Sequence, residues 1–312
     1  MRVTVTGGAG FIGANLCRRL VADLGAEVVA LDDLSTGDAA NLEGAGVDLR
    51  EGSILDPAAL DAAVEGADAV VHLAARPSVP RSLEDPAGAW AVNADGSMAV
   101  IEAVRRHDVP HLVYASSSSV YGDNPTLPKH EDLPVAAKSP YAAGKLAGEQ
   151  AALAHQASFG TATLAVRFFN VYGPLQPAGH AYAAVIPAFV SRALAGEPLE
   201  VHGDGEQTRD FTSVDSVATV LVDAVRRRVR HQGPVNLAFG SRRTLLELIA
   251  SLEALLDAPV ARTHTAPRAG DVRDSQADAR RLASLFPDVE PVAFEEGLAQ
   301  TVAWFRSGAL PR

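Results

Sequence analysis

The first thirteen residues constrain the fold of this chain more than any other stretch. Residues 3–13 read VTVTGGAGFIG, an apolar segment followed by the glycines Gly7, Gly10 and Gly13. The pattern predicts a buried strand that enters a helix through a tight turn. Gly7 permits the turn, Gly10 lets a pyrophosphate approach the backbone, and Gly13 lets the helix pack closely on the sheet. The amino end of such a helix attracts phosphates. A plain strand-to-helix turn would show the same glycines.

A second apolar segment separates these two interpretations. Residues 27–31 read EVVAL and are followed by Asp32, about twenty residues after the glycines, where a carboxylate binds the adenosine ribose hydroxyls of a dinucleotide. The same carboxylate repels a 2′-phosphate. Together the two segments predict a dinucleotide site and favour NAD over NADP.

Composition and charge exclude several classes of protein. The chain has 312 residues, 47% of them hydrophobic, which suits one large domain or two smaller ones around a sizeable core. Its formal net charge of -11 argues against a nucleic-acid partner or an anionic membrane surface. The single cysteine, Cys17, excludes an internal disulfide and fits a reducing compartment. We see no leader and no apolar run of about eighteen residues, and therefore expect a cytoplasmic protein.

Apolar segments alternate with helical ones along most of the chain, which is the pattern of a parallel sheet covered on both faces. We therefore expect an α/β fold with a doubly wound parallel sheet, the Rossmann arrangement. The expected strands are 2–6, 27–31, 47–50, 68–73, 111–115 and 162–167, with a returning strand at 234–238. The expected helices are 10–24, 57–65, 87–107, 139–159 and 214–228.

Prolines and glycines become frequent after residue 168 and indicate a smaller, loop-rich lobe. The sequence therefore predicts an NAD-binding domain at 1–169 with a return segment at 211–237, and a C-terminal substrate-binding lobe made of 170–210 and 238–312. Ligands of such a sheet bind beyond the carboxyl ends of its strands. The stretches that follow strands there are 71–75 (VHLAA), 114–122 (YASSSSVYG) and 167–174 (RFFNVYGP).

Tyr141 and Lys145 are the strongest candidates for chemistry. They lie four residues apart on an expected helix, so both side chains emerge on one face, where an ammonium stabilises a phenolate. A tyrosine with a lowered pKa can act as a general base. Ser117, in the serine-rich strand end, could bind the same substrate hydroxyl. The alternatives without a catalytic role are a Tyr-Lys pair on the surface and a serine that forms hydrogen bonds with backbone groups of its loop.

At this point the sequence resembles a known family, the extended short-chain dehydrogenase/reductases, and within it the NAD-dependent UDP-sugar 4-epimerases related to UDP-galactose 4-epimerase. The resemblance covers essentially the whole chain. It implies that Ser117, Tyr141 and Lys145 are catalytic and that Lys145 also binds the nicotinamide ribose. The motifs that carry it are 6–13 (TGGAGFIG), 72–75 (HLAA), 116–122 (SSSSVYG), 141–145 (YAAGK) and 167–174 (RFFNVYGP).

The resemblance also implies a set of NAD-binding residues and no metal. One position departs from the family: Ser53 replaces the acidic residue that binds the adenine amino group, so that contact is weaker or is made by another group. The implied NAD-binding residues are Gly7, Gly10, Phe11, Ile12, Gly13, Asp32, Ser35, Thr36, Gly37, Ser53, Ile54, Leu73, Ala74, Ala75, Asn93, Tyr141, Lys145 and Phe168.

On the substrate side, the resemblance implies a UDP-sugar. Asn170, Arg209 and Arg268 match residues that contact the diphosphate, which an arginine suits by its charge and planar fork. Asp271 would bind a ribose hydroxyl. Without the family, each arginine would be an ordinary surface residue. Residues 184, 185, 201 and 202 would border the uracil. The full set of implied substrate-binding residues is Ser117, Ser118, Ser119, Tyr141, Asn170, Ala184, Val185, Val201, His202, Arg209, Arg268, Asp271 and Ser275.

Two departures narrow the activity. Ser118 and Ser119 stand where the 4,6-dehydratases of this superfamily carry an aspartate and a glutamate, so dehydration is disfavoured. Uronic-acid epimerases carry an arginine just beyond the Tyr-Gly-Pro turn, whereas residues 175–180 read LQPAGH. A UDP-glucuronic acid 4-epimerase stays an alternative, with its carboxylate bound by Arg76, Arg81 or Arg192. An NAD-sensing binding protein is a further alternative, although such relatives lack the tyrosine or the lysine.

The resemblance implies a reaction at the sugar C4. Tyr141 takes the proton of the 4-hydroxyl, a hydride passes to NAD, and the 4-keto sugar turns over before the hydride returns. Ser275 falls where epimerases restricted to glucose and galactose carry a tyrosine, and where those accepting N-acetyl sugars carry a small residue. We expect turnover of UDP-GlcNAc and UDP-GalNAc besides UDP-glucose and UDP-galactose, unless Ser275 only caps a loop. Because relatives pair helices matching 87–107 and 139–159, we also expect a homodimer.

Overall fold

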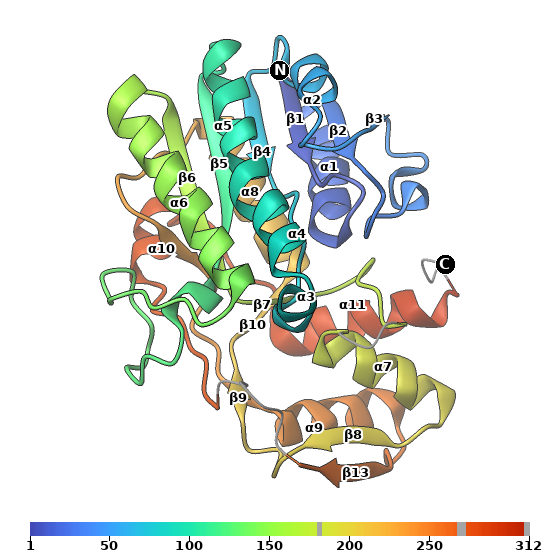
Figure 1. Ribbon diagram of the computed structural model, residues 1–312. Coiled ribbons are helices and arrows are strands. Elements are labelled where there is room, and N and C mark those ends of the chain that lie inside the picture. The colour runs from blue at the N-terminus through green and yellow to red at the C-terminus, as the bar shows by residue number, and fades with distance from the viewer. Residues whose placement is uncertain (180–182, 267–272, 309–312) are drawn as a thin grey trace.

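The computed structural model describes residues 1–179, 183–266 and 273–308. A seven-stranded parallel sheet lies at its centre (Figure 1). The strand order β11-β6-β5-β4-β1-β2-β3 places the switch in winding direction between β1 and β4. The expected doubly wound α/β fold is confirmed. The strands are β1 (Arg2–Thr6), β2 (Glu27–Asp32), β3 (Asp48–Glu51), β4 (Ala69–His72), β5 (His111–Ser117), β6 (Ala162–Phe168) and β11 (Val235–Leu237).

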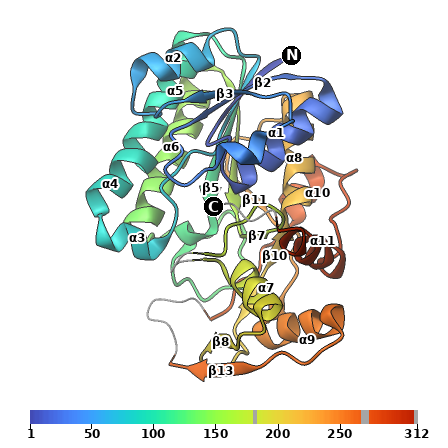
Figure 2. The ribbon, with the colours of Figure 1, turned by 90° about the vertical axis from the view of Figure 1, so that its right-hand side faces the viewer.

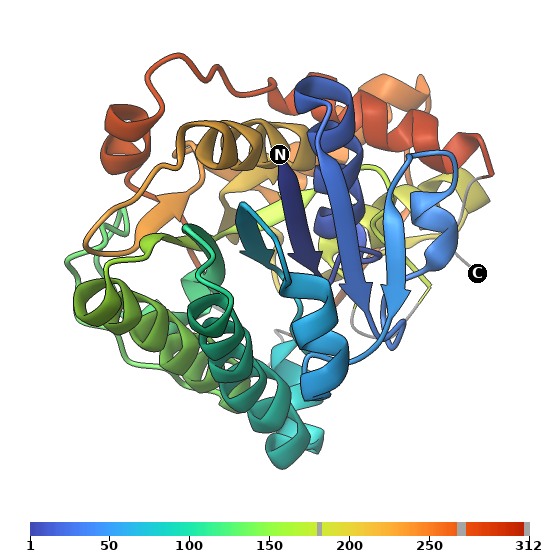
Figure 3. The same cartoon turned by 90° about the horizontal axis from the view of Figure 1, so that it is seen from above.

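Helices cover both faces of the sheet, as the view along its edge shows (Figure 3). One face carries α1 (Phe11–Leu24), α8 (Val214–Arg227) and α10 (Arg280–Leu285). The other carries α2 (Pro57–Val64), α5 (Ser97–Arg106) and α6 (Pro140–Phe159). The apolar strands are buried between these helices, which explains why their sequences are almost continuously hydrophobic.

The two ends of α6 are encoded locally. The hydroxyl of Ser139 accepts a hydrogen bond from the Ala142 N–H at 3.1 Å, and Pro140 occupies the first turn, where its missing N–H costs nothing. Gly160 ends the helix with a φ of 81°, a left-handed conformation that glycine adopts without strain. These caps fix where the helix starts, and therefore where Tyr141 and Lys145 emerge.

A helix is confirmed over the range expected at 87–107, although it is not α-helical throughout. After α3 (Val79–Glu84), the chain forms one unbroken helical segment made of α4 (Pro86–Trp90), a π-helical turn η2 (Ala91–Gly96) and α5. The wider π turn accompanies a hydrogen-bonded contact that a regular pattern does not reveal. The Asn93 side chain accepts from the Arg76 N–H at 2.8 Å and donates to the Arg76 carbonyl at 3.1 Å.

A smaller lobe lies beyond the carboxyl ends of the strands (Figure 2). Its core joins buried residues of three helices and of the neighbouring short strands. The helices are α7 (Val185–Ala195), α9 (Leu245–Leu256) and α11 (Phe294–Arg306). The short pairs are β7 (Asn170–Tyr172) with β10 (Phe211–Ser213), β9 (Thr208–Arg209) with β12 (Arg243–Thr244), and β8 (Leu199–His202) with β13 (Arg262–Thr265).

The lobe and the sheet are interlocked in sequence. The segment after the lobe's first part returns through β10 and α8 to β11, which pairs with β6 in the main sheet. Helix α10 comes from residues 238–312, yet Leu282 and Phe286 pack in the core on the α1 face of the sheet. Within the described ranges, no helix is both long and apolar enough to cross a membrane. Two short 3-10 turns are η1 (Ala39–Leu42) and η3 (Ser118–Tyr121).

Candidate active site

The glycine-rich turn between β1 and α1 has room only for glycine at its critical positions. The Gly7 N–H donates to the Leu31 carbonyl at 2.8 Å, and Gly7 has a φ of 73°. A Cβ on Gly13 would lie 2.0 Å from the Gly7 carbonyl oxygen. Helix α1 begins at Gly10 without a side-chain cap. Its first N–H groups therefore face outward at the carboxyl edge of the sheet, where they suit a phosphate.

Asp32 stands beside this turn at the end of β2. Its two carboxylate oxygens accept the Ala9 and Leu34 N–H groups, each at 2.9 Å. Burial raises the pKa of this carboxyl, while the backbone hydrogen bonds oppose that shift. A Cβ on Gly37 would lie 2.9 Å from one of the oxygens. Glycine at that position keeps the approach to the carboxylate open, so Asp32 fits a ribose contact.

The other expected cofactor residues lie at the ends of the neighbouring strands. Ser53 and Ile54 follow β3, and the Ser53 hydroxyl accepts the Leu55 N–H at 3.2 Å. Phe168 ends β6 directly opposite Ser117. These residues lie at the carboxyl edge of the sheet, where a dinucleotide is expected to bind. The NAD-binding roles of the remaining expected residues stay predictions, and these residues are Phe11, Ile12, Ser35, Thr36, Leu73, Ala74 and Ala75.

The catalytic candidates come together where β5 meets α6. Ser117 ends β5, and its side chain forms a hydrogen bond with the Tyr141 side chain. The Ser119 hydroxyl donates to the Ser117 hydroxyl oxygen at 2.9 Å. Lys145 lies one helical turn after Tyr141, with its Nζ 5.0 Å from the centre of the Tyr114 ring. The arrangement brings a phenol, a hydroxyl and an ammonium to one corner of the sheet.

Burial controls the protonation of this corner. The Lys145 side chain is almost fully buried, and desolvation lowers its pKa from 10.5 to about 8. Burial also raises the pKa of Tyr141, whereas the hydrogen bond with Ser117 lowers it. Lys145 is therefore charged below about pH 8, on the same face of α6 as Tyr141.

A buried polar chain connects the end of β1, beside the glycine turn, to the turn that follows β4. His72 lies between the hydroxyls of Thr6, at 2.7 Å, and Ser97, at 3.0 Å. Burial lowers the pKa of His72 to about 3, so its imidazole is neutral at physiological pH. Ser97 donates to the Asn93 carbonyl at 2.8 Å. The side-chain amide of Asn93 forms hydrogen bonds with the backbone of Arg76. These hydrogen bonds hold the turn that follows β4.

A cleft of about 510 Å³ opens between the two lobes. Of the substrate residues expected from the sequence, Tyr141, Asn170, Ala184, Val185, His202 and Arg209 line it. The same cleft is also lined by Pro77, Ser78, Val79 and Pro80. Tyr141 therefore lines a cleft that is large enough for a small molecule. Arg209 lines the same cleft.

Comparison with known proteins agrees with this geometry. Residues 3–238 match the NAD dependent epimerase/dehydratase family. The chain belongs to this family. It is 39% identical to the UDP-glucose 4-epimerase of Mycolicibacterium smegmatis, over 98% of this chain and 99% of that protein. It is also 33% identical to the dTDP-glucose 4,6-dehydratase of Streptomyces niveus, over 98% of this chain and 93% of that one.

Solved structures extend the similarity to three dimensions. The chain superposes with a TM-score of 0.93 on a UDP-N-acetylglucosamine 4-epimerase from Methanobrevibacter ruminantium M1, solved in complex with UDP-N-acetylmuramic acid. The two are 35% identical over 98% of each chain. The relatives of this chain in the NAD dependent epimerase/dehydratase family therefore include both epimerases and dehydratases. The residues of the site have to distinguish between these two activities.

Several residues expected at the substrate site are not among the described residues that line the cleft. The Val201 side chain is fully buried in the core of the smaller lobe, because alternation along β8 turns Glu200 and His202 toward the cleft instead. Ser117 ends β5, and Ser118 and Ser119 lie on η3; none of these three serines is among the described residues that line the cleft. Ser275 is also outside that lining, and its N–H donates to the Thr208 carbonyl at 3.1 Å. Arg268 and Asp271 lie outside the described residues.

Sequence reasoning missed some of the lining residues. Glu200 follows from the two-residue period of a strand once His202 is placed in the cleft. Gln207 lines the cleft and donates to the His202 carbonyl at 2.6 Å. The turn at 77–80 carries no comparable signal, although Ser78 has a φ of 89°, which is strained for a residue other than glycine. Strain of this kind is found where a surrounding structure holds a functional turn in place.

Proposed function

We propose that this protein catalyses the NAD-dependent C4 epimerisation of a UDP-hexose through a transient 4-keto sugar. One observation carries the proposal: Tyr141 borders both the cleft and the buried Lys145, at the edge of the sheet where Asp32 and the glycine turn form the NAD site. A base is thereby placed between the proposed NAD site and a cleft that is large enough for the substrate.

The residues divide the chemistry between them. Tyr141 takes the proton of the sugar 4-hydroxyl and later returns it, and Ser117 orients that hydroxyl through its own hydrogen bonds. Lys145 stabilises the phenolate by its charge. NAD, when bound, accepts a hydride from C4 and gives it back. Because the proton and the hydride both return to the sugar, the reaction is redox-neutral overall.

The nucleotide would be held more firmly than the hexose. Asn170 and Arg209 line the cleft and offer an amide and a guanidinium to the diphosphate. Arg268 and Asp271 complete that set by resemblance. His202 and the backbone around Val201 would border the uracil. A firm anchor at the nucleotide lets the keto sugar rotate and present its other face to the returning hydride.

Ser275 is proposed to admit N-acetyl sugars. Its backbone is hydrogen-bonded to Thr208, the residue directly before Arg209 in β9, so it lies beside the wall that carries the diphosphate contact. A serine there leaves more space than a tyrosine. We therefore assign UDP-GlcNAc and UDP-GalNAc as substrates besides UDP-glucose and UDP-galactose.

The competing activities fit the residues less well. Ser118 and Ser119 supply hydroxyls where a dehydratase needs acids, and Ser119 already donates to Ser117. Of the three arginines that could bind a uronate, Arg76 is paired with Asp85 and Arg192 lies beside Glu197. The third, Arg81, directly follows the cleft residues Val79 and Pro80, so UDP-glucuronic acid is included among the substrates to be tested. Epimerisation of a neutral hexose is therefore favoured over dehydration and over a uronate substrate.

We also propose a homodimer. Three large apolar side chains are exposed on the helical face before and within α5: Leu83 at 62%, Trp90 at 45% and Met98 at 44%. Neighbouring α6 presents the partly exposed Leu146 and Ala147. An exposed apolar face on two adjacent helices suits pairing with the same face of a second copy. Analytical ultracentrifugation of the purified protein tests this.

A panel of UDP-sugars tests the catalytic proposal. Purified protein is incubated with UDP-glucose, UDP-GlcNAc and UDP-glucuronic acid, and the products are separated by chromatography. The proposal requires the C4 epimers of the first two without loss of water. Turnover of the uronate alone, or a product lighter by one water, would contradict it.

A further inference from the structure

We propose that the buried ion pair of Glu149 and Arg167 positions the catalytic residues Ser117 and Tyr141. The inference rests on the proposed function, because it concerns the same reaction. Glu149 and Arg167 touch neither the cleft nor the proposed NAD site, so they would act through their neighbours. Both side chains are almost fully buried.

The contact between them is bidentate. Arg167 Nη2 lies 2.7 Å from Glu149 Oε1, and Arg167 Nε lies 2.9 Å from Oε2. The Ser116 hydroxyl donates to the same Oε2 at 2.6 Å. One carboxylate therefore binds a residue of β5 and a residue of β6 at once. Two parallel charge-assisted hydrogen bonds fix orientation as well as distance.

The place of this carboxylate on α6 links it to the catalytic residues. Tyr141, Lys145 and Glu149 follow one another at four-residue intervals and share one face of the helix. Ser116 lies directly opposite Arg167 across the β5–β6 ladder, and the next pair along is Ser117 and Phe168. The ion pair thus fixes the position of α6 relative to β5 and β6. It does so one residue before both strands end at the proposed active site.

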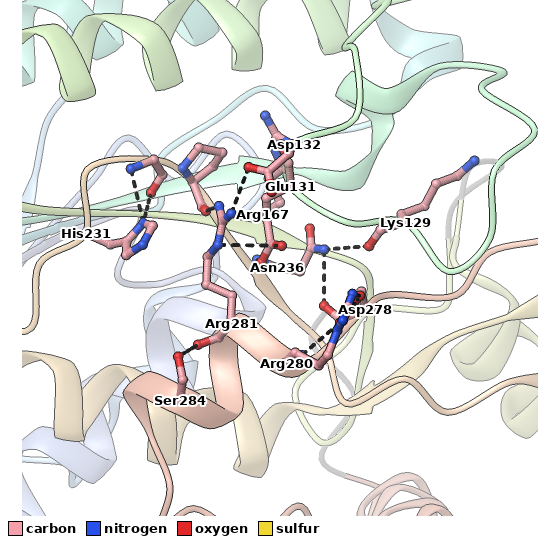
Figure 4. Close-up of polar contacts among 12 residues, drawn as sticks. Lys129, Glu131, Asp132, Arg167, His231, Asn236, Asp278, Arg280, Arg281 and Ser284 are labelled. Carbon is pink, nitrogen blue, oxygen red and sulfur yellow. Dashed lines mark hydrogen bonds and ion pairs between the residues drawn. The ribbon is translucent and has the colours of Figure 1, made fainter.

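Arg167 also holds the segment that follows Ser117. Its guanidinium lies 4.7 Å from the centre of the Tyr121 ring, and Tyr121 ends η3. Arg167 Nη1 donates to the Glu131 carbonyl at 3.4 Å. Figure 4 shows Arg167 beside Glu131 and Asn236, where the Glu131 carboxylate accepts the Asn236 N–H at 2.9 Å. Ser116, directly before Ser117, and Tyr121, at the end of the turn after it, therefore both contact the same pair.

Stability alone gives little reason for this arrangement. Replacing a buried ion pair by apolar side chains of similar volume is often neutral or stabilising, whereas removing one partner is costly. Misplacement of a catalytic group, in contrast, lowers the rate steeply. If the pair positions α6, its loss should weaken the hydrogen bond between Ser117 and Tyr141. That hydrogen bond lowers the pKa of Tyr141, so the pKa should rise when the bond weakens.

The test removes both charges together, in a Glu149→Leu and Arg167→Met double variant. We expect a folded protein with unchanged NAD content and unchanged KM. Its kcat should be lower by about 10²-fold, which is the low end of what general base catalysis supplies. The acid limb of its kcat–pH profile should move to higher pH. A matched control removes the exposed pair Asp61 and Arg106 by Asp61→Leu and Arg106→Met, which should leave kcat and its pH profile unchanged.

Retention of kcat within about twofold, or a lower kcat with an unmoved pH profile, would overturn the positioning role, because that role requires both the rate and the base to change. If the double variant does not fold, Glu149→Asp decides. It keeps the charge but shortens the side chain, so it should fold, lower kcat and shift the profile in the same direction. A Glu149→Asp enzyme with wild-type kcat would overturn the proposal.

A second measurement separates this proposal from the proposed function. Spectrophotometric titration of the tyrosines, with Tyr141→Phe as the reference in each background, reports the pKa of Tyr141 without any substrate. A rise of that pKa in the double variant supports positioning even if no UDP-sugar is turned over. Wild-type protein inactive on every UDP-sugar would count against the proposed function only.

Discussion

Tyr141 and Lys145 lie one turn apart on α6, and burial shifts their pKa values in opposite directions. It raises the pKa of the phenol and lowers that of the ammonium to about 8. Desolvation therefore works against the ionised form of both groups. The hydrogen bond with Ser117 lowers the pKa of the phenol. In the proposed function the charge on Lys145 favours the phenolate as well, so the activity of the base would depend on both neighbours.

Removing the phenol oxygen should abolish turnover without disturbing the fold. In Tyr141→Phe, only the hydroxyl is lost from a half-buried side chain. We expect kcat to fall by about 10² to 10⁴, the range of general acid–base catalysis, with NAD content and UDP binding unchanged. Steady-state kinetics with UDP-glucose and calorimetric titration with UDP measure the two effects. More than roughly a tenth of wild-type activity would place the base elsewhere.

Lys145→Met should stabilise the cofactor-free protein while it inactivates the enzyme. The pKa of Lys145 is lower in the folded protein than its usual 10.5, so below about pH 8 the fold carries an unfavourable buried charge, and stability recovers as pH rises from 8 to 10.5. The shift corresponds to at most about 3 kcal/mol. Thermal unfolding should show a higher Tm for the variant at pH 7, and a difference that shrinks above pH 8. A lower Tm at pH 7 would contradict the burial argument.

Asp32→Ala should reduce the NAD retained by the purified protein. The variant loses the carboxylate that fits the adenosine ribose and that also accepts the Ala9 and Leu34 N–H groups. The control is Asp23→Ala, which removes an exposed carboxylate in the last turn of α1 that is paired with Arg19. Cofactor released by denaturation is measured by chromatography. We expect NAD rather than NADP in wild type, a marked loss in Asp32→Ala, and none in Asp23→Ala.

Ser275→Tyr should discriminate between substrates. If Ser275 borders the hexose, a tyrosine ring occupies the space of a 2-acetamido group, and overpacking of about 1–3 kcal/mol corresponds to a loss of roughly 5- to 150-fold in kcat/KM for UDP-GlcNAc. The value for UDP-glucose should change little. Ser284→Tyr, on the exposed side of α10, serves as control. Equal losses for both substrates would show that Ser275 only supports its loop.

The sequence predicted the sheet better than it predicted the cleft. The central strands were found because a strand buried on both faces is largely an apolar run, as at 27–31 and 162–167, whereas the edge strand β3 is partly exposed. The helix expected at 87–107 is confirmed, but its π turn, which accompanies the contact of Asn93 with Arg76, is not encoded by a local pattern. Asp32 and Tyr141 belong to short local motifs, and the structure places them beside the glycine turn and in the cleft lining.

Residues of the cleft that come from the second lobe were harder to assign. Val201 was expected at the uracil, yet its side chain points into the lobe core, whereas Glu200 faces the cleft. Which face of a short strand is buried depends on what packs against it, here α7 and α9. The tie between Glu149 and Arg167 was missed for a related reason, since its partners lie on separate elements that meet only in the folded chain.

The most direct test of the account follows the hydride. UDP-glucose carrying deuterium at C4 is converted by the enzyme in ordinary water, and the product is analysed by mass spectrometry and NMR. The account predicts UDP-galactose with the deuterium still at C4, because the same hydride leaves and returns while Tyr141 exchanges only the hydroxyl proton. Deuterium lost to solvent or moved to another carbon, or a product lighter by one water, would contradict it.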